Sequence, residues 1–185
     1  NSYSANQAVA FFDRLPPLTN GGRAKYALAL AATGDMAKAE TWARNAWREG
    51  PLTDDDQARL QTLFGNKMSA ADNDARVDRL LWSNATRVAA QIMPFTSPAR
   101  RPVLEARLAY KLKSLDAEAK YAAAGKAALS DSGLLLDRAA ALKASGNNWG
   151  ARELLANRPA LSAPPVLPKE WLKTLLSYAQ SAASD

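Results

Sequence analysis

Carboxylic acids are among the side chains of this chain that could act as proton donors in catalysis. A catalytic acid needs a pKa raised by an apolar, partly buried pocket. The glutamates instead stand among charged and small residues typical of exposed helix faces; they are Glu40, Glu49, Glu105, Glu118, Glu153 and Glu170. The sequence therefore predicts no catalytic residue.

Other catalytic and metal chemistry is limited by composition. The chain contains no histidine and no cysteine. Their absence excludes thiolate nucleophiles, disulfides, imidazole bases, triads built on histidine and zinc sites of the cysteine/histidine type. We expect no metal site and no cofactor.

The charge of the chain favours an anionic partner. The formal net charge is +6, which suits nucleic acid, an acidic lipid or a polymer that carries carboxylates. The same charge also serves simple solubility, and the composition leaves both interpretations open. No apolar run approaches the roughly 18 residues of a membrane-spanning helix, so no membrane span is expected.

Arginines gather in the middle third of the chain, where a groove lined by them could hold carboxylates. The candidate binding residues are Arg76, Arg79, Arg87, Arg100, Arg101 and Arg107, together with Trp149. Nucleic acid is the rival ligand, but the cluster lacks interleaved aromatic residues, and Asp72, Asp74 and Asp78 stand beside it. We expect no nucleic acid partner. A solvated face with local ion pairs is the alternative interpretation of the cluster.

The tryptophans could be stacking platforms for sugars, but their helical spacing favours core positions. Trp47 lies on the apolar stripe of its expected helix, and Trp82 is in line with small residues that would face a neighbouring helix. Trp149 follows Asn147 and Asn148 close to an expected turn. It is therefore the candidate for ligand contact.

The elements that would position these residues are helices, because β-branched residues are few and never alternate over a useful length. Capping residues and glycine or proline stops mark their ends. Helices are expected at 35–50, 53–65, 69–82, 98–115, 116–129, 131–145, 147–156 and from about residue 169. A proline-rich connection at 159–168 precedes the last one.

One phrase occurs twice in the chain. "LAATGDMAKA" begins at Leu30 and "LKASGNNWGA" at Leu142, and each contains a helix end, a glycine and a new helix start. This is the pattern of an αα-hairpin corner, where glycine adopts the left-handed conformation without a Cβ clash. A degenerate third copy, "LLWSNATRVA", has Asn84 in the glycine position, and asparagine is the next-best residue there.

These corners predict an all-α fold over a single domain spanning 1–185. The copies are irregularly spaced and do not match a strict tetratricopeptide period of about 34 residues. We therefore expect an αα-superhelix of irregular helical hairpins, a tetratricopeptide-like right-handed array. Each hairpin would bury its apolar face only against its neighbours, and the concave side would offer a long binding surface.

Three stretches carry a more specific signal: "FGNKMSAADNDARVDRLLW" at 64–82, "GLLLDRAAALKASG" at 133–146 and "PPVLPKEWL" at 164–172. They resemble the non-catalytic superhelical region of soluble lytic transglycosylases, over most of the chain from about Phe64 onward and more faintly before it. In that family the superhelix curls into a ring, and a separate lysozyme-like domain cleaves the peptidoglycan glycan strand. The family's catalytic Glu-Ser pair and Gly-Leu-Met-Gln stretch are absent from this chain.

The resemblance implies a periplasmic scaffold, part of a longer protein, that guides a peptidoglycan glycan strand toward a catalytic lysozyme-like domain. A tetratricopeptide-like protein-protein interaction module is the alternative. Asparagine, not methionine, is the first residue, so we expect a chain trimmed from a longer one.

The last expected helix carries an apolar stripe, and the sequence leaves open what covers it. The stripe consists of Leu172, Leu175, Leu176 and Ala179, flanked by Trp171 and Tyr178. It could fold back onto the preceding hairpin, including Leu154 and Leu155, or stay uncovered. In the second case it would support a homodimer through the C-terminal helix.

Overall fold

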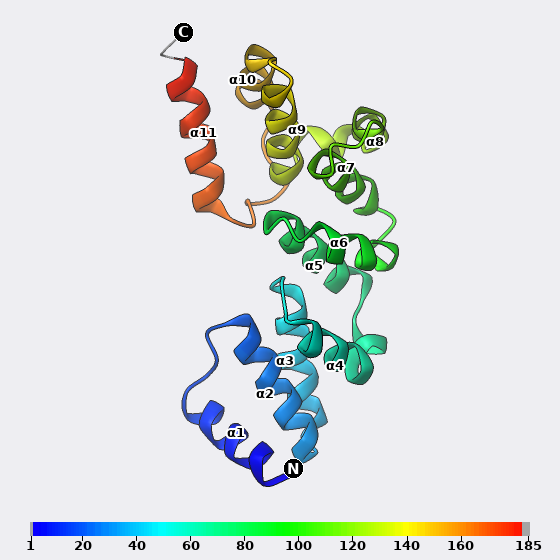
Figure 1. Ribbon diagram of the computed structural model, residues 1–185, viewed down its shortest axis with the longest axis vertical. Helices are drawn as coiled ribbons and strands as arrows, with labels where there is room; N and C mark the ends of the chain where they lie inside the picture. The colour runs from blue at the N-terminus through cyan, green and yellow to red at the C-terminus, as the bar shows by residue number, and fades with distance from the viewer. Residues whose placement is uncertain (1, 183–185) are drawn as a thin grey trace. The chain divides into compact units, whose positions relative to one another are not determined.

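A computed structural model describes residues 2–182 of the chain (Figure 1). In this range the protein is all-α, as the sequence predicts, with eleven α-helices, three short 3-10 helices and no strand. The helices form two compact units. The first runs to Ser83 and includes Phe95–Ser97, and the second comprises Asn84–Pro94 and the chain from Pro98 onward.

The first unit contains five α-helices and one 3-10 helix within the described range. They are α1 (Ser2–Arg14), α2 (Asn20–Thr33), α3 (Met36–Arg48), α4 (Asp54–Phe64), η1 (Gly65–Lys67) and α5 (Ala70–Trp82). The core is rich in alanine on α2 and α3, which lets these two helices approach closely, and Leu60 and Phe64 of α4 close it. The caps expected at Asp35, Thr53 and Ser69 are confirmed, because each accepts a backbone N–H three residues on. The cap expected at Asp116 forms no such bond.

The second unit contains the remaining helices. They are α6 (Thr86–Ile92), α7 (Arg101–Lys111), α8 (Ala117–Ala123), η3 (Gly125–Leu129), α9 (Ser132–Ala144), α10 (Asn148–Ala156) and α11 (Pro168–Ala182); the short η2 (Met93–Phe95) follows α6. One apolar cluster joins α7, α8 and α9 through residues such as Val103 and Leu134. A second joins α9, α10 and α11 around Leu135, Leu155 and Trp171.

The predicted hairpin corners are confirmed by the backbone. Gly34, Asn84 and Gly146 have φ of 92°, 57° and 86°. At the first corner the N–H of Asp35 donates to the carbonyl of Leu30 at 3.0 Å, and at the last the N–H of Asn147 donates to that of Leu142 at 2.9 Å. These six-to-one bonds, with the five-to-two bonds from each glycine, form a Schellman motif.

One corner was not expected. Lys113, just beyond α7, has φ of 53°. Its N–H donates to Tyr110 O at 3.0 Å, and the Ser114 N–H donates to Ala109 O at 2.9 Å, the same pattern as at the glycine corners. The sequence did not reveal this corner because its left-handed residue is a lysine.

Two expected helices differ from the structure. The segment 98–115 is helical only over Arg101–Lys111, because residues 98–100 form a turn and Lys113 ends the helix in the left-handed conformation. The segment 116–129 breaks at Gly125, where φ is 57° and a 3-10 helix replaces α8. The bounds of α1, α2 and α6 were not assigned from the sequence.

The apolar stripe of α11 is partly covered. Trp171 is buried, and Leu175 and Tyr178 pack against the cluster of α9 and α10, so this part folds back onto the preceding hairpin. Leu172 and Leu176 remain 64% and 58% exposed. The proline-rich connection before α11 is held to the end of η3 by the Ser162 N–H, which donates to Ser130 O at 3.0 Å. Among the described helices, none is long and apolar enough to cross a membrane.

Candidate functional site

Arg76 is a buried structural residue of the first unit. Its side chain is 0% exposed, and Nη1 donates to the carbonyls of Trp47 at 3.0 Å and Gly50 at 2.6 Å. Nη2 donates to Gln57 Oε1, and the guanidinium lies over the Trp47 ring with Cζ 4.1 Å from its centroid. Burial lowers the pKa of Arg76 to about 10. The side chain thus joins α3, α4 and α5 and offers nothing to an external ligand.

Arg107 has a similar position in the second unit. It is 1% exposed, and Nε donates to Asp137 Oδ2 of α9 at 2.8 Å. A guanidinium held this way is already paired and desolvated, and removing its partner would leave a buried charge. Arg107 therefore joins α7 to α9 inside the unit.

The other sequence-predicted arginines lie nearer the surface. Arg79 pairs with Glu49 at 3.1 Å in the first unit. In the second unit Arg100 pairs with Asp131 at 2.9 Å, and Arg101 donates to Pro94 O at 3.0 Å. Arg87 is exposed. Together the six arginines are divided between the two units, Arg76 and Arg79 in the first and the other four in the second.

The core positions predicted for the tryptophans are confirmed in part. Trp47 and Trp171 are buried, and Trp42 and Trp82 are half-buried. Trp149, the expected exception, is 68% exposed near the start of α10. A ligand contact by Trp149 and by the surface arginines stays a prediction.

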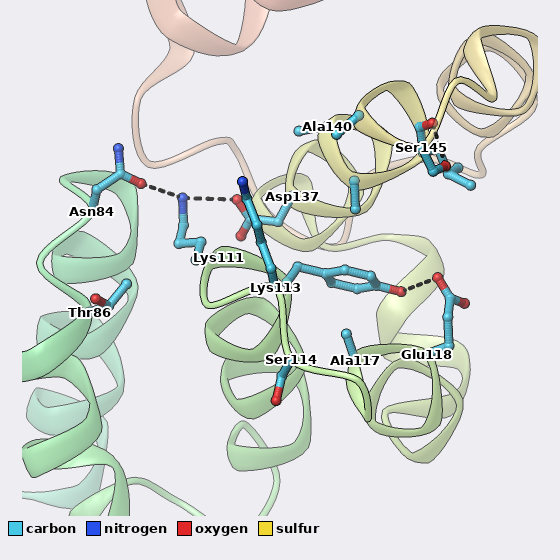
Figure 2. A pocket seen from close by; sticks show the side chains of 14 residues that line it. Asn84, Thr86, Lys111, Lys113, Ser114, Ala117, Glu118, Asp137, Ala140 and Ser145 are labelled. Carbon is cyan, nitrogen blue, oxygen red and sulfur yellow. Dashed lines mark hydrogen bonds and ion pairs between the residues drawn. The ribbon is translucent and has the colours of Figure 1, made fainter.

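A cleft of about 830 Å³ lies in the second unit, and both charged and apolar side chains line it (Figure 2). Its walls come from the start of α6, the end of α7 with the following corner, the start of α8 and the second half of α9. The lining residues are Asn84, Thr86, Tyr110, Lys111, Lys113, Ser114, Ala117, Glu118, Asp137, Ala140, Ala141, Leu142, Ala144 and Ser145. The volume is within the range of about 300 to 1,000 Å³ that is common for ligand pockets.

The cleft exists because α9 presents small side chains to it. Ala140, Ala141 and Ala144 line it at helical spacing after Asp137, and Ala117 faces them from α8. The left-handed corner at Lys113 turns the chain away from α7 before α8 begins, which leaves the space between these alanines open.

Lys111 is held firmly at one side of the cleft. Its ammonium lies 3.0 Å from Asp137 Oδ1 and donates to Asn84 Oδ1 at 2.9 Å (Figure 2). Asp137 also accepts from Arg107 through its other oxygen. Two cations therefore share this carboxylate. The hydrogen bond from Lys111 also orients the Asn84 amide, whose oxygen faces Lys111.

Glu118 is engaged at the opposite side. The Tyr110 hydroxyl donates to Glu118 Oε1 at 2.8 Å, and Arg138 Nη2 lies 3.0 Å from Oε2. Burial raises the pKa of Tyr110, and the hydrogen bond to Glu118 raises it further. The carboxylate is thus neutralised by Arg138, which in turn lies over the Tyr121 ring.

Lys113 is the charged residue of the lining that has no partner among the described residues. Its side chain is exposed and forms no ion pair or hydrogen bond with residues 2–182. Figure 2 shows it extending over the cleft from the corner after α7. A positively charged donor is therefore available to an anionic ligand here.

These cleft residues were not among the sequence-predicted site residues. Lys111, Asp137 and Asn84 are separated by 26 and more positions in the chain, and no local pattern connects them. No local signal marks Lys113 either, because the corner that carries it is not recognisable from the sequence. Within the described residues no cluster of acidic side chains could hold a metal ion.

Comparisons with protein-family models, with curated proteins and with solved structures found no match for this chain.

Proposed function

We propose that this chain is a non-catalytic α-helical scaffold that binds peptidoglycan glycan strands in the periplasm and guides them toward the lysozyme-like domain of a lytic transglycosylase. The resemblance of residues 64–82, 133–146 and 164–172 to that family's superhelical region supports the identity of the polymer. The observation that carries binding is the open cleft of the second unit with its unpaired Lys113.

The scaffold role is favoured over a catalytic one by the state of the cleft carboxylates. Asp137 is paired with Arg107 and Lys111, and Glu118 with Arg138 and the Tyr110 hydroxyl. A general acid must be free to give its proton to a leaving group. Neither carboxylate is placed for that, so we expect the glycan to be bound and not cut.

Co-sedimentation of the full chain with purified peptidoglycan sacculi tests this function. We expect retention at low ionic strength that declines steeply toward 1 M salt, because the Debye length falls from about 10 Å at 0.1 M to about 3 Å. We also expect no release of anhydro-muropeptides. Retention that does not depend on salt would argue against binding through exposed cations, and turnover lost on substitution of one glutamate would overturn the non-catalytic assignment.

A tetratricopeptide-like interaction module is the second candidate. The observation in its favour is that α2 with α3, and α9 with α10, are antiparallel neighbours joined by corners with the same hydrogen bonds at Gly34 and Gly146. Exposed Trp149 would suit a protein ligand, because tryptophan is enriched at such interfaces. Failure of the chain to bind sacculi at any salt concentration would favour this function over the first.

A further inference from the structure

The left-handed corner after α7 keeps a side chain where the equivalent corners have none. Gly34 and Gly146 occupy this position at the other two Schellman corners, and the space around each of these glycines is open. A lysine in the same conformation is less stable than glycine would be. Two left-handed corners border the cleft, at Asn84 and Lys113, and the second carries a cation at a cost to the backbone.

The cleft also contains neutral hydrogen-bond donors that have no partner among the described residues. Because Asn84 Oδ1 accepts from Lys111, the Nδ2 group of Asn84 is left without a partner among residues 2–182. The hydroxyl of Thr86 also forms no bond with the described residues. The cleft thus combines one free ammonium with neutral donors at Asn84 and at Thr86 of α6.

The fixed charges of the cleft leave one cation for a ligand. Asp137 and Glu118 are each paired within the protein, so the exposed Lys113 is the charge that an anionic group can pair with. The remaining wall is made of alanines that can contact methyl groups. A ligand with a carboxylate and small aliphatic side chains matches both features.

We propose that the cleft binds a carboxylate of the peptide stems of peptidoglycan, with Lys113 as its charge partner. This assignment rests on the proposed function for the source of the carboxylate. Peptide stems carry carboxylates and alanine side chains, which match the free ammonium and the alanine wall. Lys111 acts as a positioning residue, because it holds the Asn84 amide in place from its own ion pair with Asp137.

The test is calorimetric titration of the 185-residue chain with the tetrapeptide stem released from peptidoglycan, at low salt. We expect binding that weakens about tenfold in Lys113→Gln, since a hydrogen bond to a charged group contributes enough for a factor of that order. Lys113→Arg should retain binding. The stem with amidated carboxyl groups should bind no better to the wild-type chain than to Lys113→Gln.

Two further variants separate a lost contact from a lost fold. Lys113→Gly removes the same charge, but glycine suits the left-handed backbone, so the melting temperature should stay the same or rise while binding falls. Lys126→Gln makes an equal charge change in the same unit, on an exposed side chain outside the cleft, and should bind like the wild type.

The outcomes distinguish this inference from the proposed function. Sacculi that retain wild type and Lys113→Gly equally would leave the scaffold function standing and overturn the cleft assignment. Absence of stem binding to the wild-type chain would overturn it as well. An unrelated acidic peptide of equal length and charge that binds as tightly would assign the cleft to a protein ligand and overturn the peptide stem as its occupant.

Discussion

Gly133 of α9 lies directly against the guanidinium of Arg107 in α7. A Cβ atom added to Gly133 would lie 2.2 Å from Arg107 Cζ and 2.5 Å from Nη1. The guanidinium cannot simply swing away, because it is buried and its Nε is bonded to Asp137. The close approach of α7 and α9, and with it one wall of the cleft, therefore depends on a position without a side chain.

Gly133→Ala should destabilise the protein even though alanine is the better helix former. We expect the free energy of unfolding to fall by about 1 to 3 kcal/mol, the usual cost of overpacking a filled interior. The matched control is Gly21→Ala in α2, where no atom lies within 4 Å of the added Cβ. There the change should be neutral or stabilising by up to about 1 kcal/mol. Urea denaturation of both variants measures the difference, and equal behaviour would show that Arg107 moves at little cost.

At the glycine corners, the cost of a substitution should come from the positive φ and not from a clash with neighbouring atoms. Gly34→Val and Gly146→Val should each lower the free energy of unfolding by about 1 to 3 kcal/mol, because both have positive φ and open space around the position of a Cβ. Asn84→Gly should be neutral or mildly stabilising. Thermal melts check all three, and a Gly146→Val protein with wild-type stability would contradict the strain argument.

Arg76 and Arg79 on α5 should differ sharply in their effect on stability. Arg76→Met leaves the Trp47 and Gly50 carbonyls buried without their donor, and we expect a loss of about 3 to 5 kcal/mol. Arg79→Met removes only a partly exposed ion pair with Glu49, for which about 0 to 1 kcal/mol is typical. Denaturation curves in parallel would show whether the two arginines have the structural and surface roles assigned to them.

The stability of the protein should fall at alkaline pH because of the raised pKa of Tyr110. Burial raises its pKa in the folded chain, whereas the unfolded residue titrates near its ordinary value of about 10. Above pH 10 the folded state therefore keeps a proton that the unfolded state loses, and the free energy of unfolding falls as pH rises.

Comparison with Tyr110→Phe isolates this contribution, because the other titrating groups are common to both proteins. Between pH 10 and 11.5, wild type should lose stability more steeply than the variant. If the free energies of unfolding of wild type and variant fall in parallel over that interval, Tyr110 has the same pKa in the folded and the unfolded state.

Self-association through α11 should depend on the residues that the structure leaves exposed. Leu175 and Tyr178 pack against α9 and α10, so their substitution would disturb the fold. Leu172 and Leu176 are the exposed members of the stripe. We expect a concentration-dependent shift from monomer to dimer that Leu172→Asp combined with Leu176→Asp removes without loss of helicity. Sedimentation that shows only monomer over a hundredfold concentration range would exclude the homodimer.

Much of the helical fold could be predicted from the sequence, because its determinants are local. The caps Asp35, Thr53 and Ser69 bond to N–H groups three residues on, and Gly34 and Gly146 adopt the left-handed conformation that their type permits. The Lys113 corner could not be predicted in this way. Lysine has no intrinsic preference for that backbone, and the hydrogen bonds from its turn and the packing of α7 and α8 impose it.

The candidate site could not be predicted, because its parts meet only through tertiary contacts. In the sequence, Arg76 and Arg107 look like members of a basic surface. The structure buries both, since Trp47, Gln57 and Asp137 reach them from other helices. The sequence by itself determined the helices, their caps and the chemistry that the chain lacks. Tertiary packing decided which charged side chains are neutralised inside the protein. It also decided that the unpaired ammonium of Lys113 borders a cleft. Both depend on burial and pairing between residues that are far apart in the chain.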